Sequence, residues 1–318
     1  MKKLILIFFF ACQFVHAADK DSTYLYHFRH MEFPEGLGKC DACGCSATGG
    51  SMGFSSMFNN NFVGLRYFYQ SYTSKDGIFD NSPKVDENFN TIQVWARVPV
   101  SKKIQVSALL PYHFHTRERS TGDENISGIG DMTVIAMYSL YQTKKDSTVF
   151  THKIQAGGGV KFPTGKYEEA NNLGSVNPGF QVGTGSFDYL FLAEYMIKRK
   201  NLGLNAMANY TIKTENEKEY QFGNQFNYGT TLFYLFDLKH IKLVPQAGLA
   251  GEVYEENTQR HQAVPDTAGD ILFSRFGIEA GRKNFSIGLN AMLPISQNLS
   301  GGNVEANYRW SVNLNYSL

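Results

Sequence analysis

The sequence predicts an all-β fold, a transmembrane up-and-down antiparallel β-barrel of about 12 strands with both termini in the periplasm. Three observations predict it. An export signal opens the chain, apolar residues alternate with polar ones from residue 61 onward, and short connections alternate with long ones. After the signal, no apolar stretch reaches the roughly 18 residues that a membrane-spanning helix needs. Any membrane crossing is therefore made by strands.

The first residues have the features of a secretory signal peptide. Met1-Lys2-Lys3 supplies positive charge, the run from Leu4 to Ala11 is apolar, and Ala17-Ala18 offers small residues for cleavage. The alternative is a lipoprotein signal that uses Cys12, but the residues before this cysteine lack the usual aliphatic and small side chains. We assign residues 1–18 to a signal peptide.

Residues 19–60 show no alternation and are predicted to form a periplasmic extension. Cys40, Cys43 and Cys45 are so close in sequence that their thiolates can converge on one soft cation, Cu(I) or Zn(II). His27 and His30 could complete the ligand set. The alternative is one local disulfide with a third thiol left over, which an oxidising compartment favours. The extension could enter the barrel as a plug or remain outside as a docking arm, and the sequence does not choose.

Residues 61–318 are predicted to form the barrel. In the segment 104–114 the even positions are almost all apolar and the odd positions largely polar or small, which is the two-residue period of a strand. Twelve segments alternate in this way, some more cleanly than others: 62–73, 89–100, 104–114, 129–142, 152–163, 186–198, 202–213, 221–237, 241–254, 271–282, 285–295 and 308–318.

The connections between these segments are of two alternating kinds. Those at 101–103, 143–147, 198–201, 237–240 and 282–284 are short, whereas those at 74–88, 115–128, 164–185, 214–220, 255–270 and 296–303 are mostly longer and more polar. Short periplasmic turns that alternate with longer outer loops are typical of outer-membrane barrels. A periplasmic β-sandwich is the alternative, but its strands are typically only about 5–6 residues long.

A closed sheet is the form in which strands can cross a membrane, because hydrocarbon cannot hydrogen-bond an open backbone edge. Aromatic residues make up 14% of the chain and suit the girdles at the two membrane interfaces. The last strand ends with Tyr316 and Leu318 on its apolar face, which resembles the signal that barrel-assembly machinery recognises. We therefore expect this machinery and outer-membrane lipid as partners, in the outer membrane of a Gram-negative bacterium.

The polar side of the strands is predicted to face the interior. It includes charged residues of both signs that we predict to line a pore: Arg66, Arg97, Lys161, Glu194, Glu252, Arg275 and Glu279. The alternative is that these residues only fill the interior and hydrogen-bond across it. Trp95 shares the inward parity. The 30 basic and 29 acidic residues balance, so no basic field favours nucleic acid as a partner.

Three Gly- and Pro-centred segments, 127–133, 160–167 and 177–188, resemble in order and spacing the outer-membrane transporter family named after the meta-pathway of phenol degradation. The resemblance covers about residues 60–318 and implies a barrel that passes small, often hydrophobic molecules. Asp131 and Asp188, inside these segments, are expected just inside the barrel mouth as turn-capping residues. The cysteine-rich extension departs from the family pattern and looks like a Bacteroidetes-type variant.

The leading hypothesis is an outer-membrane channel or transporter for a small solute that the sequence does not identify. The second is a barrel that anchors the cysteine extension for Cu or Zn binding or for docking a partner. We do not expect an enzyme. An outer-membrane phospholipase needs a Ser nucleophile beside a His on the outer face of the barrel, and His113 and His115 stand in no such motif.

Overall fold

The computed structural model describes residues 61–76, 81–119, 122–143, 149–167, 170–173 and 179–318. The predicted signal peptide and the cysteine-rich extension lie outside the described residues, so what the sequence predicts for them stays a prediction. Within the described ranges, no helix is long and apolar enough to cross a membrane.

The described chain is mostly β-strand. In chain order the elements are β1 (Phe62–Lys75), β2 (Lys84–Pro99), β3 (Ile104–Glu118), β4 (Glu124–Ile129), β5 (Met132–Gln142), β6 (Thr151–Phe162), β7 (Asp188–Arg199), β8 (Leu202–Lys213), β9 (Tyr220–Gln221), β10 (Gln225–Tyr234), β11 (Phe236–Leu238), β12 (Ile241–Tyr254), β13 (Thr258–Gln259), β14 (Gln262–Ala263), β15 (Gly269–Arg282), β16 (Phe285–Leu299), a 3₁₀ turn η3 (Ser300–Gly302) and β17 (Val304–Ser317).

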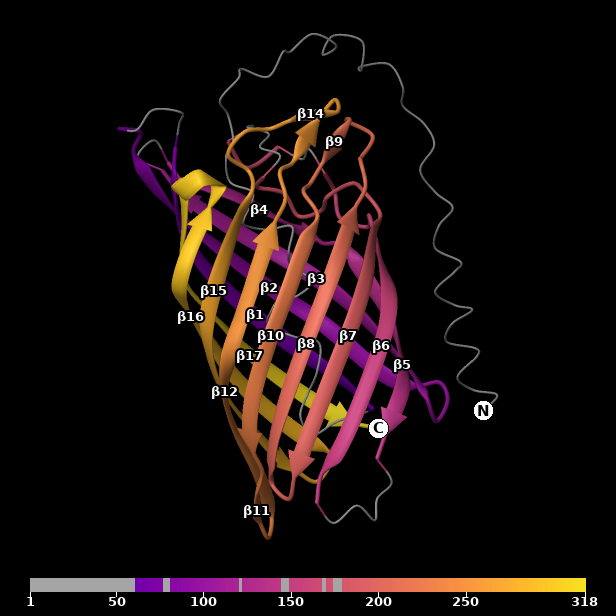
Figure 1. The fold of residues 1–318 in the computed structure, drawn as a ribbon. Coiled ribbons are helices and arrows are strands. Elements are labelled where there is room, and N and C mark those ends of the chain that lie inside the picture. The colour runs from indigo at the N-terminus through magenta and orange to yellow at the C-terminus, as the bar shows by residue number, and fades with distance from the viewer. Residues whose placement is uncertain (1–60, 77–80, 120–121, 144–148, 168–169, 174–178) are drawn as a thin grey trace. The chain divides into compact units, whose positions relative to one another are not determined.

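All strands except β9, β13 and β14 form one closed antiparallel sheet (Figure 1). Strands that follow one another along the chain pair with one another, and the sheet closes where β1 pairs with β17, with Phe62 opposite Ser317. β4 and β5 are two halves of one crossing, and so are β10 and β11, so the 14 strands of the described sheet make 12 crossings. The predicted 12-stranded up-and-down barrel is confirmed.

Side chains alternate across this wall, with apolar residues outside and polar residues inside. On β2, Gln93 and Trp95 are buried, whereas their neighbours Ile92 and Val94 are 45% and 48% exposed. The same outward apolar pattern recurs on other strands, for example at Leu289 of β16. An outer surface of this composition matches hydrocarbon and not water. The alternation that predicted the strands thus also indicates which side chains face lipid and which face the interior.

At the long-loop end the strands extend further than predicted. β3 runs to Glu118 and β4 begins at Glu124, although the sequence predicts a loop over 115–128. The outward-pointing residues of this extension, Thr116 and Glu118, are polar. Backbone pairing continues beyond the apolar band, where no lipid-facing apolar side chain is needed. Apolar alternation therefore detects the membrane-crossing part of a strand and misses its extension into water.

The two ends of the barrel differ, as predicted. At the end that carries β11, tight turns join the strands, and Lys200, Lys239 and Lys283 adopt positive φ values of 51°, 43° and 53° in three of them (Figure 1). Positive φ is the conformation that two-residue hairpins use to match the strand twist. At the opposite end the connections are longer, and β9, β13 and β14 form a small separate sheet.

Val94→Arg should destabilise the barrel by about 2–4 kcal/mol, because hydrocarbon cannot solvate a charge on the lipid-facing wall. Val100→Arg is the matched control: this valine is 66% exposed but follows the last residue of β2, where a charge should cost about 0–1 kcal/mol. Urea-induced unfolding of the protein refolded in lipid vesicles measures both free energies. Equal destabilisation by the two substitutions would contradict a membrane-facing outer wall.

Candidate functional site in the barrel interior

The structure places the charged residues predicted from strand parity on the inner side of the wall. Arg66, Lys161, Glu252, Arg275 and Glu279 are at most 9% exposed. The two others, Arg97 and Glu194, are partly buried. The set is not brought together at one point. Lys161 belongs to a network near the long-loop end, Glu252 to a separate ion pair, and the remaining residues to a layer nearer the short turns.

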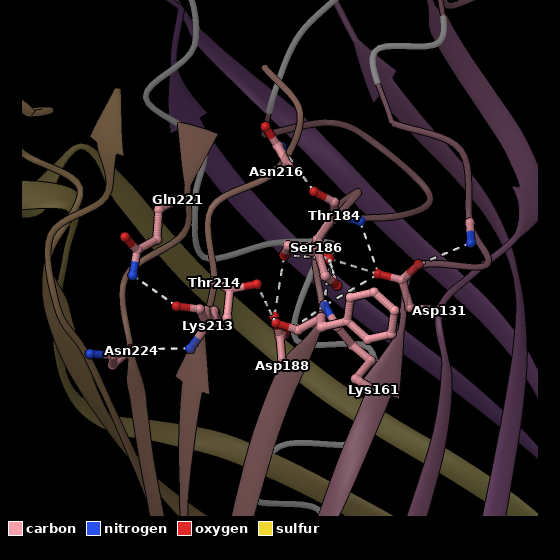
Figure 2. A network of polar contacts seen from close by, with 12 residues as sticks. Asp131, Lys161, Thr184, Ser186, Asp188, Lys213, Thr214, Asn216, Gln221 and Asn224 are labelled. Atoms are coloured by element: carbon pink, nitrogen blue, oxygen red, sulfur yellow. Dashed lines mark hydrogen bonds and ion pairs between the residues drawn. The ribbon is translucent and has the colours of Figure 1, made fainter. Parts of the chain in front are cut away.

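Lys161, at the end of β6, holds two carboxylates in the interior (Figure 2). Its Nζ lies 2.6 Å from Asp188 Oδ2 at the start of β7 and 3.2 Å from Asp131 Oδ2 between β4 and β5. It also donates a hydrogen bond of 2.6 Å to Thr184 Oγ1. All four side chains are at most 6% exposed. The ammonium therefore offsets part of the negative charge of the two carboxylates where water cannot.

Residues 179–187, from the long connection between β6 and β7, fold into the interior, and we call them the inward segment. Phe180, Val182 and Thr184 are at most 4% exposed. The Asp131 carboxylate accepts the N–H of Thr184 and the N–H of Gly165, both at 2.9 Å. It thereby ties both arms of the connection to the kink between β4 and β5. The Asp131 carboxylate therefore anchors a distant loop and pairs with Lys161, whereas the sequence predicted that it caps a local turn.

Close backbone packing lets this connection dock against the wall. A Cβ at Gly165 would lie only 2.8 Å from Gly183 Cα and 3.0 Å from Gly130 Cα. A side chain at this position would displace the neighbouring backbone, so glycine is required there. Thr164 Oγ1 accepts the N–H of Met132 at 2.9 Å and donates to the Gly130 carbonyl at 2.8 Å. The connection thus continues the wall beside β4, where β6 has already ended.

The inward segment packs into a cluster of buried side chains that we call the aromatic layer. The Phe180 ring centroid lies 5.9 Å from that of Phe89 and 6.2 Å from that of His115. The members of the layer are Phe68, Tyr72, Phe89, Ile126, Phe180, Val182, Ala250, Tyr254, Ile271, Phe273, Met292, Leu299, Val304 and Ala306. They come from strands at both ends of the chain as well as from the inward segment.

Two buried ion pairs border the aromatic layer. Arg309 of β17 donates hydrogen bonds of 2.8 and 3.0 Å to the two carboxylate oxygens of Glu252 on β12. The guanidinium carbon of Arg309 also lies 4.4 Å from the Phe273 ring centroid. Arg117 Nη2 of β3 lies 2.6 Å from Glu87 Oε1 of β2. Charge-assisted contacts of this geometry are the strong hydrogen bonds of a protein interior, so each cation is compensated locally.

Nearer the short turns, Arg66, Arg97 and Arg275 form a second layer, which we call the arginine layer. The Arg66 guanidinium carbon lies 3.7 Å from the Trp95 ring centroid, so the inward-facing tryptophan has a cation–π partner. Arg66 interacts electrostatically with Arg97, Arg275 and Glu279. The interior therefore has an aromatic level toward the long loops and a basic level toward the short turns.

The sequence predicted the interior charges but overlooked the aromatic layer. Phe68, Phe89 and Phe273 stand on the inward parity of their strands, and that parity was the available signal. Phe180 and Val182 belong to a connection without any period. Their burial depends on contacts with distant strands, so no local sequence pattern predicts it.

His113 and His115 of β3 face the interior and not the outer wall. His113 Nδ1 and Thr91 Oγ1 share a hydrogen bond of 2.8 Å, and the two imidazole rings lie 4.9 Å apart. Neither histidine is available for a catalytic site on the lipid face. Among the residues that the structure describes, no group of three His, Cys, Asp or Glu could hold a metal ion. The predicted cysteine site falls outside those residues.

The family described as "Putative MetA-pathway of phenol degradation" matches residues 82–315. The chain belongs to this family. The matched range includes Lys161, the inward segment and most of both interior layers. No sequence among curated proteins matches the chain.

Among solved structures, an outer-membrane channel from Pseudomonas putida F1 is 14% identical, with a TM-score of 0.63, over 83% of this chain and 97% of that chain. The β-domain of the Bordetella autotransporter BrkA is 8% identical, with a TM-score of 0.49, over 82% of this chain and 100% of that chain. At such identities the likeness to the P. putida structure supports the outer-membrane barrel fold.

Lys161→Met should release the inward segment from the interior. The substitution leaves Asp131 and Asp188 buried without their cation, and breaking a buried pair in this way costs about 3–5 kcal/mol. Amide hydrogen exchange of Thr184, whose N–H binds Asp131, should become much faster. The control is Lys84→Met, which removes an exposed ion pair with Glu305 worth about 0–1 kcal/mol. Unchanged exchange in Lys161→Met would show that the network does not anchor the segment.

Proposed function

We propose that this chain is an outer-membrane channel through which small, largely apolar molecules cross the membrane. In this proposal the short turns and the C-terminus face the periplasm and the long loops face outward. The observation that carries it is the aromatic layer inside a closed barrel whose outer wall is itself apolar. A barrel that served only as an anchor would need the outer wall but not this inner surface.

The chemistry of the aromatic layer favours apolar solutes over hydrated ones. A polar solute would give up hydrogen bonds to water in passing Phe68, Phe89 and Phe273 and would gain none from their rings. An aromatic solute would exchange ring contacts with those side chains, each worth about 0.5–1.5 kcal/mol beyond the buried area. The layer therefore discriminates by desolvation before any specific contact is made.

Among the described residues, the inward segment can be displaced from the interior without opening the wall. Phe180 reaches the layer from a connection and not from a strand, so its displacement breaks no pairing of the barrel sheet. Loop motions of this kind occur in nanoseconds to microseconds, far faster than a strand can leave a barrel. Phe180 and its neighbours would thus act as the gate, and the Lys161 network would anchor it.

The relatives support this proposal. The P. putida structure is, by its printed title, an outer-membrane channel. The family description places its members with phenol degradation, and phenol is a small aromatic molecule of the kind that the aromatic layer suits.

Phe180→Ala should raise the single-channel conductance of the mature protein in a planar lipid bilayer. Removing a buried phenylalanine costs about 3–5 kcal/mol of packing, which favours displacement of the inward segment. Phe187→Ala is the control, since Phe187 is 47% exposed at the end of the same segment. We expect small conductance steps for the unmodified protein and for Phe187→Ala, and larger steps for Phe180→Ala. Silence from all three folded proteins would overturn the channel proposal.

The cysteine extension supports a second candidate function, binding of Cu(I) or Zn(II) outside the described part of the chain. The observation that favours it is the spacing of Cys40, Cys43 and Cys45. Under reducing conditions the mature protein should retain about one metal ion per chain, measured by elemental analysis after gel filtration. The triple Cys→Ser variant should retain none while its barrel stays folded. Metal content that is equal in both proteins would exclude this site.

A further inference from the structure

The arginine layer carries more positive than negative charge. Arg66 interacts with Arg97 and Arg275, and the carboxylates close to these three arginines among the described residues are Glu279 and Glu194. Each carboxylate also accepts a hydrogen bond from a neutral side chain. Ser286 donates to Glu279 at 3.1 Å, and Asn205 donates to Glu194 at 2.9 Å. Arg275 makes no hydrogen bond or ion pair with a carboxylate among the described residues, so its positive charge is not compensated there.

Buried polar atoms beside the arginines have no partner among the described residues. Gln93 lies opposite Arg66 in the β1–β2 pairing and is 0% exposed, yet neither its amide nitrogen nor its oxygen makes a hydrogen bond there. The same is true of Trp95 Nε1 and Arg275 Nε. An unsatisfied buried polar group costs about 1–3 kcal/mol. A ligand that offers hydrogen-bond acceptors at this level would recover part of that energy.

An apolar cluster adjoins the arginines. Phe62, Trp95, Leu109, Ile135 and Leu190 are buried together on the interior side. Trp95 belongs to both groups, because one face lies against Arg66 and its ring meets that of Phe62 edge-on at 4.4 Å. Cations and apolar surface thus meet at one side chain. The matching ligand has a carboxylate at one end and an apolar body at the other.

The nearest end of the barrel is basic as well. Among the described residues of the short-turn end, the acidic side chain is Asp237, whereas the basic ones are Lys102, Lys103, Lys198, Arg199, Lys200, Lys239, Lys242, Arg282 and Lys283. A field of one sign at the mouth of a low-dielectric interior raises the local concentration of ions of the opposite sign. This field points to anions as the solutes that reach the arginine layer.

We propose that the arginine layer is a binding site for small organic acids, aromatic carboxylates above all. Arg66 and Arg275 would take the carboxylate, and the cluster around Trp95 and Leu109 would take the apolar body. The inference rests on the proposed channel function and names the solute class of its basic level. A neutral aromatic molecule would share the aromatic layer but would form no charge-assisted hydrogen bond with the arginines.

Trp95 provides a direct readout of binding. The chain has two tryptophans, and Trp310→Phe leaves Trp95 as the single reporter. The probes are 4-nitrobenzoate and 4-nitrobenzamide, which both quench tryptophan fluorescence, have nearly the same shape and differ in charge. We expect saturable quenching of Trp95 by 4-nitrobenzoate and only linear, collisional quenching by 4-nitrobenzamide. Saturable quenching of equal affinity by both probes, or by neither, would overturn the inference. This comparison needs no change in the arginine layer.

Variants then locate the site. In the Trp310→Phe background, Arg66→Gln and Arg275→Gln should each weaken 4-nitrobenzoate binding about tenfold or more, the effect of losing one charge-assisted hydrogen bond. The matched control is Lys84→Gln with Arg260→Gln, two exposed cations at the long-loop end. This pair should leave the affinity unchanged. Equal weakening by the control would reduce the effect to overall charge and overturn the assignment to the arginine layer.

Conductance measured on the same Trp310→Phe protein separates the two proposals. Conductance without saturable quenching by 4-nitrobenzoate would sink the organic-acid site and leave the channel intact. Saturable, charge-selective quenching in a folded protein that never conducts would sink the channel and leave the anion site. With both proposals correct, 4-nitrobenzoate should also block the conductance at the concentrations that quench Trp95, and 4-nitrobenzamide should not.

Discussion

The closure of the sheet between β1 and β17 is the interaction on which everything else depends. Hydrocarbon offers a backbone no hydrogen-bond partner, so every membrane-crossing strand must be paired on both edges. Once the sheet is closed, each strand sends alternate side chains to lipid and to the interior. The apolar side chains contact lipid. The polar side chains are confined to the interior, and their charges must be compensated there.

The barrel solves this second problem with local ion pairs from neighbouring and distant strands. Arg309 binds Glu252, Arg117 binds Glu87, and Lys161 stands between Asp131 and Asp188. Buried pairs of this kind add little to net stability, but removing one partner is strongly unfavourable. They therefore fix which side chains lie next to one another. The pairs and the packing of the aromatic layer together hold the inward segment in place.

The interior is divided along the barrel axis in a way that has chemical consequences. Toward the long loops, Phe89, Phe180 and Phe273 form an apolar level, beside which Arg117 and Arg309 each have a carboxylate partner. Toward the short turns, Arg275 has no carboxylate partner among the described residues, and Arg66 meets an apolar cluster at Trp95. An apolar molecule is accommodated by the first level. An amphipathic anion is accommodated by both in succession.

The sequence by itself determined the strands and their two faces. Each strand such as β2 or β16 meets lipid on one side along its whole crossing, so a strict period of two is imposed locally and can be read without knowing any partner. The length of each membrane crossing followed for the same reason. The positions of interior charges such as Arg66 and Glu252 were likewise legible from parity. Strand extensions into water, as at the end of β3, were not predicted because the apolar alternation stops at the lipid boundary.

Only the tertiary structure determined which side chains contact one another in the interior. Glu252 and Arg309 are 57 residues apart, and parity says that both point inward but not that they pair. Phe180 lies in a connection, where neither period nor composition distinguishes an inward course from an outward one. Its position follows from the close packing of Gly165 on Gly183 and Gly130 and from the carboxylate of Asp131. Local sequence determines which residues form strands and which form connections. Contacts between distant segments determine where a connection lies, because the burial of a loop depends on surfaces formed by other parts of the chain.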